Sequence, residues 1–361
     1  MQEKEIKEIY THLADELSIC TFENRLLFSL TEDLKYILNI ISSTFNLRSE
    51  LNSVYGKYHN IVVYGAGCVG QLIALSYDIK NIMVFCDRNE NKQKRMFYGH
   101  KVISFEELGG DTYNDCTIII SVLKDELIME ITEDLLKLGF SRNKILIFKE
   151  ELLRLSSEIA SADIIRPLYF VPDIISPLSK EEIFVDAGCL ECSTSVEFAK
   201  WCNYKYKKII AFEPNPESYL ICAEKSKNIS NMTVYPYGLW NEETEVSFDI
   251  VPFAIASSRI VNDNPAIKDN LVKIKTVKLD DILNGEEVTF IKMDIEGAEL
   301  NALKGAEQTI LKYRPRLAIS VYHKPEDIWE IPTYILSLHK DYKLYLRHYT
   351  LSSSETVLYA I

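Results

Sequence analysis

The stretch that most constrains the fold is an apolar run followed by a small-residue turn at residues 183–195, IFVDAGCLECSTS. Its first three residues, 183–185, are typical of a strand that is buried on both faces of a parallel sheet. Asp186 ends the run, and Ala187 and Gly188 form a tight turn before a helix expected over about 195–201. Small residues in such a turn let a bound ligand approach the main chain, although Asp-x-Gly also occurs in turns for packing reasons alone. The stretch therefore predicts a parallel α/β sheet with a ligand site at its carboxyl edge.

The length and charge of the chain restrict its class. A chain of 361 residues predicts two domains, and 47% hydrophobic with 26% charged residues is ordinary for a globular protein. The net charge of −13 argues against a nucleic-acid partner, since such proteins carry a basic face. The charged start MQEKEIKEIY is unlike a signal peptide, and no apolar run approaches the roughly 20 residues of a membrane span. We therefore expect a cytoplasmic protein without a membrane span, while homo-oligomerisation stays open.

The eight cysteines are scattered through expected helices and strands rather than spaced as a disulfide framework. Cys189 and Cys192 form a CxxC pair, but neither a second pair nor a pair of histidines accompanies it in the sequence. Buried, reduced thiols therefore fit the pattern better than a zinc or iron–sulfur site, and no metal is predicted.

Composition and periodicity divide the chain into four segments. Apolar residues recur at helical spacing in residues 1–55, which predicts a helical cap or interface element. Residues 56–150 alternate strand and helix patterns, and residues 181–361 do so again. Between these two domains, residues 151–180 contain three prolines, which suit a connector packed on the surface.

The 56–150 segment contains a strand, a glycine-rich turn and a helix in the order that dinucleotide-binding folds use. Three glycines match GxGxxG directly after an apolar run: Gly65, Gly67 and Gly70. Asp87 ends the next strand, where a ribose-binding acid belongs in that fold. The segment resembles the Rossmann-like domains of bacterial sugar-modifying and polysaccharide proteins, including its GHKVIS stretch at 99–104. That resemblance implies a bound nucleotide or nucleotide sugar, or else a purely structural domain.

In residues 181–361, five apolar runs with helical patterns between them predict a parallel sheet. Polar residues follow four of these runs: Asp186, Glu213, Asp294 and His323. Two further runs, 342–347 and 356–361, flank a serine-rich turn and predict a hairpin. This hairpin places an antiparallel strand in an otherwise parallel sheet, and the fold class is α/β.

Glu213 lies 27 residues after Asp186, at the end of the second strand of its domain. A carboxylate there can accept hydrogen bonds from both hydroxyls of an adenosine ribose. Enzymes that use NAD share this arrangement, but the incomplete GxGxxG pattern and the final hairpin favour S-adenosylmethionine (SAM) as the ligand. The alternative for Glu213 is a solvated loop acid without a ligand.

Three charged residues alternate along the end of one apolar strand: Lys292, Asp294 and Glu296. Side chains in a strand alternate between its faces, so these three are expected to point the same way, toward the ligand-binding edge of the sheet. Burying three charges is costly unless they pair or serve a purpose. The alternative is a structural ion pair between Lys292 and Asp294.

Residues 181–361 resemble the FkbM-type family of SAM-dependent methyltransferases. The resemblance is carried by the stretches FVDAG, FEPNPESY, YGLWNEETEVSF, TVKLDDIL, FIKMDIEGAELNALKGAE and RLAISVYH. It implies a class I methyltransferase sheet and transfer of a methyl group to a hydroxyl, often on a sugar or polyketide. By position, it implies that Asp186, Gly188 and Glu213 hold SAM. The candidate cofactor site is completed by four neighbouring residues: Ala187, Ser193, Asn215 and Gly238. Cys192 departs from the family, in which a glycine is usual at this place.

The resemblance also implies that Asp294 and Glu296 lie near the transferred methyl group, and Lys292 belongs to the same candidate catalytic set. A carboxylate such as Asp294, or His323, can take the proton of the acceptor hydroxyl. Asp294, Glu296 and His323 can instead hold a divalent ion, and His323 can also be a purely structural, hydrogen-bonded histidine.

We therefore predict a SAM-dependent O-methyltransferase that acts on a small-molecule or glycan acceptor, of the kind used in polysaccharide biosynthesis. Two alternatives stay open. A nucleotide-sugar-binding protein without catalysis would account for the 56–150 domain, and an NAD(P)-dependent oxidoreductase would account for its glycine pattern.

Overall fold

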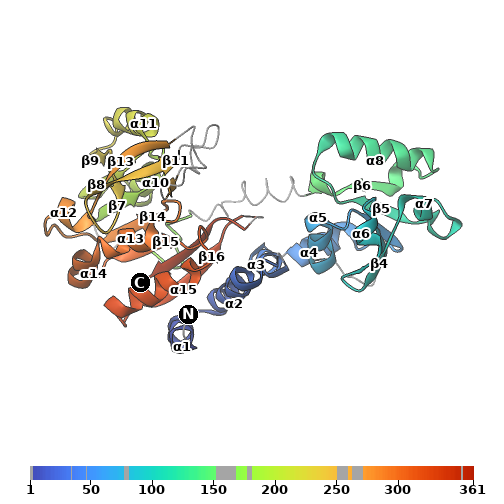
Figure 1. The fold of residues 1–361 in the computed structure, drawn as a ribbon, viewed down its shortest axis with the longest axis horizontal. Helices are drawn as coiled ribbons and strands as arrows, with labels where there is room; N and C mark the ends of the chain where they lie inside the picture. The colour runs from blue at the N-terminus through green and yellow to red at the C-terminus, as the bar shows by residue number, and fades with distance from the viewer. Residues whose placement is uncertain are drawn as a thin grey trace. The chain divides into compact units, whose positions relative to one another are not determined.

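The computed structural model describes residues 3–33, 35–45, 47–76, 81–151, 168–176, 181–249, 259–261, 271–350 and 353–361. The chain forms two compact units (Figure 1). One consists of residues 1–31 together with 166–361, and the other of residues 32–165. The segment expected as one helical element, 1–55, is thus divided after Thr31. Among the described helices, none has the length and apolar character needed to cross a membrane.

The 32–165 unit is an α/β sheet with the strand order β3-β4-β2-β1-β5-β6. Its strands are parallel except for the pairing of β3 with β4. Its strands are β1 (Ile61–Tyr64), β2 (Ile82–Cys86), β3 (Met96–Phe97), β4 (His100–Ile103), β5 (Thr117–Ile120) and β6 (Ile145–Ile147). Its α-helices include α3 (Lys35–Phe45), α4 (Leu47–Tyr55), α5 (Cys68–Ser76), α6 (Glu90–Gln93), α7 (Phe105–Leu108) and α8 (Asp125–Lys137). The apolar strand residues are buried on both faces, as expected for a parallel sheet covered by helices.

The second unit is organised around a seven-stranded sheet with the order β9-β8-β7-β14-β15-β17-β16. Its strands are β7 (Ile183–Ala187), β8 (Lys208–Phe212), β9 (Met232–Tyr235), β14 (Phe290–Met293), β15 (Arg316–Ser320), β16 (Leu344–His348) and β17 (Thr356–Ala360). β17 is antiparallel to both of its neighbours, and the other pairings are parallel. The predicted α/β class and the predicted antiparallel last strand are both confirmed.

Helices and a smaller sheet complete this unit. The helices of the strand–helix alternation are α10 (Ser193–Trp201), α11 (Pro216–Ser226), α12 (Leu279–Leu283), α13 (Glu299–Lys304), α14 (Glu307–Tyr313) and α15 (Asp327–Leu338). The smaller sheet has the order β10-β13-β11-β12 and consists of β10 (Gly238–Leu239), β11 (Thr244–Asp249), β12 (Arg259–Val261) and β13 (Leu271–Val277). The chain passes from β7 to β8 on one side and returns to β14 on the other side of β7. This reversal creates a switch point at the carboxyl ends of β7 and β14, where open α/β sheets bind ligands.

Part of the expected connector, 151–180, lies in the core of this unit. Tyr169, Phe170, Val171 and Ile175 are buried, and they pack in one apolar cluster with Phe184, Phe198 and Phe290. Residues 152–167 and 177–180 of the expected connector lie outside the described residues. Residues 169–171 and Ile175 therefore face the core, whereas Pro172, Asp173 and Ser176 are exposed at the surface.

The N-terminal helices α1 (Glu3–His12) and α2 (Glu16–Thr31) pack against the edge strand β16 and against α15 (Figure 1). The Ala14 N–H donates to the Leu344 carbonyl at 2.9 Å, and the Leu346 N–H donates to Ser18 Oγ at 3.0 Å. The Arg347 guanidinium, which is almost fully buried, lies 2.5 Å from the Asp15 carboxylate. These contacts cover the outer side of an edge strand, which would otherwise offer unpaired N–H and C=O groups.

We expect Asp15→Asn to destabilise the unit that contains β16. The substitution leaves the buried Arg347 without its counter-charge, and the partial exposure of Asp15 limits the loss to about 1–2 kcal/mol. Glu8→Gln is the matched control, because its ion pair with Lys340 is solvent-exposed and long at 3.6 Å. All three tryptophans, at 201, 240 and 329, belong to this unit, so tryptophan fluorescence during urea unfolding reports on it selectively. Equal midpoints for Asp15→Asn and Glu8→Gln would contradict this account.

Candidate functional site

A pocket opens at the carboxyl ends of β7, β8 and β14, which is the switch point of the sheet. Seven of the predicted site residues line it: Ala187, Gly188, Glu213, Asn215, Gly238, Asp294 and Glu296. Four others do not line it: Asp186, Ser193, Lys292 and His323. The pocket also has an apolar and aromatic wall, to which Phe212, Tyr237, Leu239 and Phe248 contribute. The structure thus brings most of the predicted residues to one place.

Glu213 is a buried acid at the pocket wall rather than a solvated loop acid, since its side chain is only 6% exposed. One carboxylate oxygen accepts the Leu190 N–H at 2.9 Å, and the other accepts the Asn215 N–H at 2.9 Å. Burial raises the pKa of Glu213 to about 7, although these two hydrogen bonds oppose the shift. The carboxyl group is therefore close to half-ionised at neutral pH.

Asn215 is held by its own helix. Its side-chain oxygen accepts the N–H groups of Glu217 at 3.0 Å and Ser218 at 3.4 Å, so Asn215 is the N-cap of α11. Pro216 occupies the first turn, where its missing N–H is not needed. The sequence Glu-Pro-Asn-Pro thus begins a helix directly after the acid, which fixes the position of Glu213 at the pocket.

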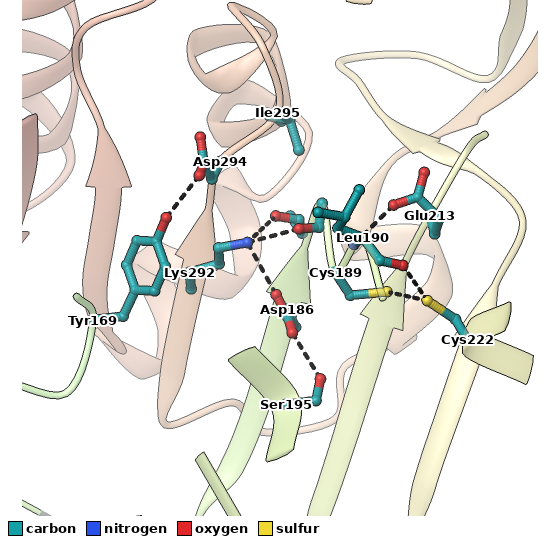
Figure 2. Close-up of polar contacts among 12 residues, drawn as sticks. Tyr169, Asp186, Cys189, Leu190, Ser195, Glu213, Cys222, Lys292, Asp294 and Ile295 are labelled. Carbon is teal, nitrogen blue, oxygen red and sulfur yellow. Dashed lines mark hydrogen bonds and ion pairs between the residues drawn. The ribbon is translucent and has the colours of Figure 1, made fainter. Parts of the chain in front are cut away.

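Asp186 and Lys292 form a fully buried ion pair beneath the turn that follows β7 (Figure 2). The Lys292 ammonium lies 3.1 Å from the Asp186 carboxylate and donates to the carbonyls of Ala187 at 3.1 Å and Gly188 at 2.8 Å. Ser195 Oγ donates to the other oxygen of Asp186 at 2.7 Å. Burial alone would lower the pKa of Lys292, but the nearby carboxylates of Asp186 and Asp294 raise it, so Lys292 is a cation. This pair acts on the turn rather than on the pocket.

Gly188 is required by the main chain itself. Its φ of 75° lies in the left-handed region that favours glycine, and a Cβ there would lie 2.0 Å from the Asp294 carbonyl oxygen. The turn after β7 therefore packs directly against the end of β14. The small residue that the sequence assigned to ligand approach also permits this contact between the two strands.

Asp294 is the polar centre of the opposite wall. Tyr169 donates to its Oδ2 at 2.7 Å, and Tyr322 donates to its Oδ1 at 3.3 Å. Burial would raise the pKa of Asp294, but Lys292, His323 and the Tyr169 hydroxyl outweigh it and lower the pKa below its usual range. The direct Lys292–Asp294 pair that the sequence allowed is replaced by the Lys292–Asp186 pair. Asp294 is therefore a carboxylate that faces the pocket.

His323 lies behind this wall among three carboxylates. Its Nδ1 is 2.9 Å from Glu299 Oε1, and its Nε2 is 3.5 Å from both Asp294 Oδ1 and Glu296 Oε1. Burial lowers the pKa of His323, but Glu296, Glu299 and Asp294 together raise it to about 11. His323 is thus an imidazolium at neutral pH and has no free lone pair with which to accept a proton. Asp294, Glu299 and His323 come within metal-ligand distance of one another, so the divalent-ion hypothesis stays a prediction, with Glu299 rather than Glu296 as the third residue of the group.

The turn between β7 and α10 shows where Ser193 and Cys192 lie. Ser193 is exposed at the first turn of α10 and does not line the pocket. Cys192 is buried with φ of 62°, and Leu190, which lines the pocket, has φ of 46°. Cys192 therefore takes a backbone conformation that glycine adopts more easily.

Some pocket residues were not predicted from the sequence. Tyr322 follows β15 and Glu355 precedes β17, so their places at strand ends could have predicted them as pocket residues. Leu190 lies inside the predicted turn. Tyr169, which holds Asp294, comes from the proline-containing segment before β7 and carries no local signal.

Comparison with known protein families supports the methyltransferase resemblance of the unit that contains the seven-stranded sheet. The family model described as the methyltransferase FkbM domain matches residues 192–350. Residues 192–350 therefore form an FkbM-type methyltransferase domain. The resemblance found in the sequence is thereby confirmed for residues 192–350, and the matched family is one of methyltransferases. A second model, described as C2185-like, N-terminal, matches residues 57–146.

Solved structures similar to the chain include an FkbM methyltransferase from Methylobacillus flagellatus, with 19% identity, a TM-score of 0.47, and coverage of 94% of this chain and 99% of that one. An rRNA methylase from Streptococcus thermophilus has 15% identity, a TM-score of 0.33, and coverage of 51% and 87%. Fibrillarin from Aeropyrum pernix, with natively bound SAM, has 9% identity, a TM-score of 0.33, and coverage of 52% and 70%. No curated protein matches the sequence.

In the 57–146 region, the glycine pattern is accounted for largely by packing. A Cβ on Gly70 would lie 2.0 Å from the Gly65 carbonyl oxygen, and Gly65 has φ of 116°. Asp87 accepts the Ala66 N–H and the Lys92 ammonium, each at 2.9 Å. A Cβ on Gly67, in contrast, would meet only Lys92 Nζ at 3.9 Å. Nucleotide binding by these four residues stays a prediction.

We expect Lys292→Met to destabilise the FkbM domain by about 3–5 kcal/mol, the usual cost of removing one partner from a buried ion pair. The variant leaves the Asp186 carboxylate without its cation and two carbonyls without a donor. Lys208→Met is the control, because Lys208 and its partner Glu286 are each 35% exposed, and we expect a loss below about 1 kcal/mol. Tryptophan fluorescence in urea measures both. A Lys292→Met protein as stable as the native one would show that the pair does not hold the turn.

Proposed function

We propose that the FkbM domain transfers a methyl group from SAM to a hydroxyl group of a sugar, a glycan or a related small molecule. The observation that carries this proposal is the pocket at the switch point, which is lined by the buried acid Glu213 after β8 and by a second carboxylate, Asp294, after β14. The two walls have different chemistry, which suits a donor and an acceptor bound side by side.

The Glu213 side of the pocket fits the adenosine part of SAM. Each oxygen of Glu213 accepts one backbone N–H and keeps a lone pair, so the carboxylate can also accept both ribose hydroxyls. Phe212, Leu239 and Phe248 supply an apolar surface for an aromatic base. Ala187, Gly188, Asn215 and Gly238 line the same region. In this proposal Asp186 supports SAM binding indirectly, through Lys292 and the turn.

The Asp294 side fits an acceptor that carries hydroxyl groups. Its polar lining consists of Asp294, Glu296, Tyr322 and Glu355, and carboxylates are good acceptors for the hydroxyls of a sugar. The net charge of −13 argues against a nucleic-acid acceptor. A small polyhydroxylated molecule is therefore the acceptor class that we propose.

The methyl group on the sulfonium of SAM is already electrophilic, so the chain's own task is to align the hydroxyl and exclude water. The acceptor oxygen forms a bond to the methyl carbon while the carbon–sulfur bond breaks. Asp294 accepts the hydroxyl proton, because it is the ionised carboxylate at the pocket wall. His323 is not the base, since it is already protonated; it positions Asp294 and Glu296.

The two alternatives account for less of the structure. A binding protein without catalysis would leave the Asp294 cluster with no task. An oxidoreductase would depend on the turn at 65–70, where packing explains two of the three glycines and Asp87 is already occupied by donors. A cytoplasmic location and a place in polysaccharide biosynthesis stay predictions.

We expect Glu213→Gln to weaken SAM binding about 10- to 100-fold, which corresponds to the roughly 1.5–3 kcal/mol of hydrogen bonds to a charged group. Native affinity should also fall by up to about 10-fold between pH 8 and pH 6, because the pKa of about 7 makes Glu213 neutral below that pH. Calorimetry on the full chain measures both, and Glu217→Gln, an exposed acid on α11, is the control. A pH dependence that persists in Glu213→Gln would remove Glu213 from the site.

We expect Asp294→Asn to lower turnover about 10²- to 10⁴-fold, the range for a positioned acid–base group, with SAM affinity nearly unchanged. Release of the demethylated product, followed with a panel of monosaccharides and nucleotide sugars, measures turnover. Asp281→Asn, an exposed acid on α12, is the control. Added Mg²⁺ or Mn²⁺ should have little effect; turnover that depends on added Mg²⁺ or Mn²⁺ would favour the divalent-ion hypothesis instead. Full activity in a folded Asp294→Asn protein would exclude both roles.

A further inference from the structure

Three cysteines meet beside the turn that lines the pocket. Cys189 and Cys192 come from the connection between β7 and α10, and Cys222 comes from α11. Their sulfur atoms all lie within 4.8 Å of one another, and the sulfurs of Cys189 and Cys222 are 3.5 Å apart. All three side chains are at most 1% exposed. Figure 2 shows the sulfur atoms of Cys189 and Cys222 facing each other beside Leu190.

The fold brings a third thiol, which the sequence pattern did not indicate, to the CxxC pair. The CxxC pair predicted no metal because no second pair follows it in the sequence. Cys222 lies 30 residues after Cys192, and α11 returns it to the same place, so three thiols converge from two elements. Three sulfur ligands at one point are the donor set that thiophilic metal ions prefer.

The backbone of the turn indicates that the third thiol is there for a reason beyond packing. Leu190 and Cys192 both have positive φ, at 46° and 62°, and each such residue costs about 1–2 kcal/mol relative to a relaxed conformation. Glycine at 192 would remove that cost. The cysteine instead places its sulfur next to two others, in a small cluster whose remaining buried member is Ala211. A strained backbone conformation persists only when surrounding interactions stabilise it. Three thiols are weak hydrogen-bond donors and supply little of that stabilisation.

We propose that Cys189, Cys192 and Cys222 bind a zinc ion as three thiolates. Zinc–sulfur bonds of about 2.3 Å in a tetrahedron place sulfurs about 3.8 Å apart, which the observed spacing approaches. The Leu190 carbonyl, which accepts a hydrogen bond from Cys222 Sγ, lies at the cluster and can take the fourth position. Binding releases three thiol protons to solvent and leaves one net negative charge on the site.

The site would fasten the 189–192 turn to α11. Leu190 lies between the two ligands of the turn, lines the pocket, and donates its N–H to Glu213. An ion held by Cys189, Cys192 and Cys222 therefore fixes one wall of the pocket without touching the ligand. Metal binding itself does not depend on the proposed methyl transfer.

The test uses the full chain, purified with reduced thiols. Metal content by mass spectrometry should be about one zinc per chain, and Co²⁺ added to the metal-free protein should give a thiolate-to-cobalt band in the near ultraviolet. Cys192→Gly and Cys222→Ser should each lose metal and band at least 10-fold. Cys192→Gly is expected to stay folded, because glycine relieves the strain at 192. Cys202→Ser is the control, since Cys202 is buried in a different cluster and should keep both signals.

Three results would overturn the proposal. A native protein with eight free thiols that binds neither zinc nor cobalt would identify the cluster as packed thiols. A disulfide between Cys189 and Cys222, found by peptide mass mapping of the protein before reduction, would assign the cluster to redox chemistry. Retention of the cobalt band by folded Cys192→Gly and Cys222→Ser would place the metal elsewhere.

Discussion

The buried ion pair between Lys292 and Asp186 is the interaction on which the pocket depends. The two residues lie opposite each other on the adjacent strands β14 and β7, so the pair joins the strands at the switch point of the sheet. A buried pair of this kind is tolerated only when its remaining hydrogen-bonding capacity is filled. Ser195 and the carbonyls of residues 187 and 188 do so. The same contacts bend the chain into the turn that forms one wall of the pocket.

Two cations keep Asp294, on the pocket wall at the end of β14, in its ionised form. Lys292 and His323 both lie near Asp294 without lining the pocket, and both lower its pKa. Asp294 is therefore ionised but is a weak base. This favours a mechanism in which the carboxylate mainly orients the acceptor hydroxyl, and receives its proton late, when the oxygen has already begun to bond to carbon. In the proposed mechanism, two residues that do not line the pocket therefore help to set the basicity of the proton acceptor.

The strand pattern predicted the sheet, because buried parallel strands are continuous apolar runs. The strand pattern was less informative about the direction of side chains beyond the ends of the strands. Alternation placed Lys292, Asp294 and Glu296 on one side, but β14 ends at Met293 and Glu296 has φ of 55°, so the alternation does not continue. Residues from distant segments, such as Tyr169 and Cys222, left no local signal. The helical pattern of α1 and α2 showed an apolar face without showing that β16 and α15 cover it.

The strand–glycine–helix turns after β1 and after β7 can be compared, and the comparison shows what a glycine pattern can establish. In both, a glycine is needed because another backbone segment lies where a Cβ would be, at Gly70 and at Gly188. The pattern therefore reports close approach of main chains first. What differs is the acid on the neighbouring strand. Burial would raise the pKa of Asp87, but Lys92 and backbone N–H groups lower it, and three donors already occupy its carboxylate. Glu213 has a raised pKa and only two backbone donors, so a ligand hydroxyl would stabilise its ionised form. In the proposed function, the acid with unfilled hydrogen-bonding capacity, rather than the glycine, therefore marks the ligand site.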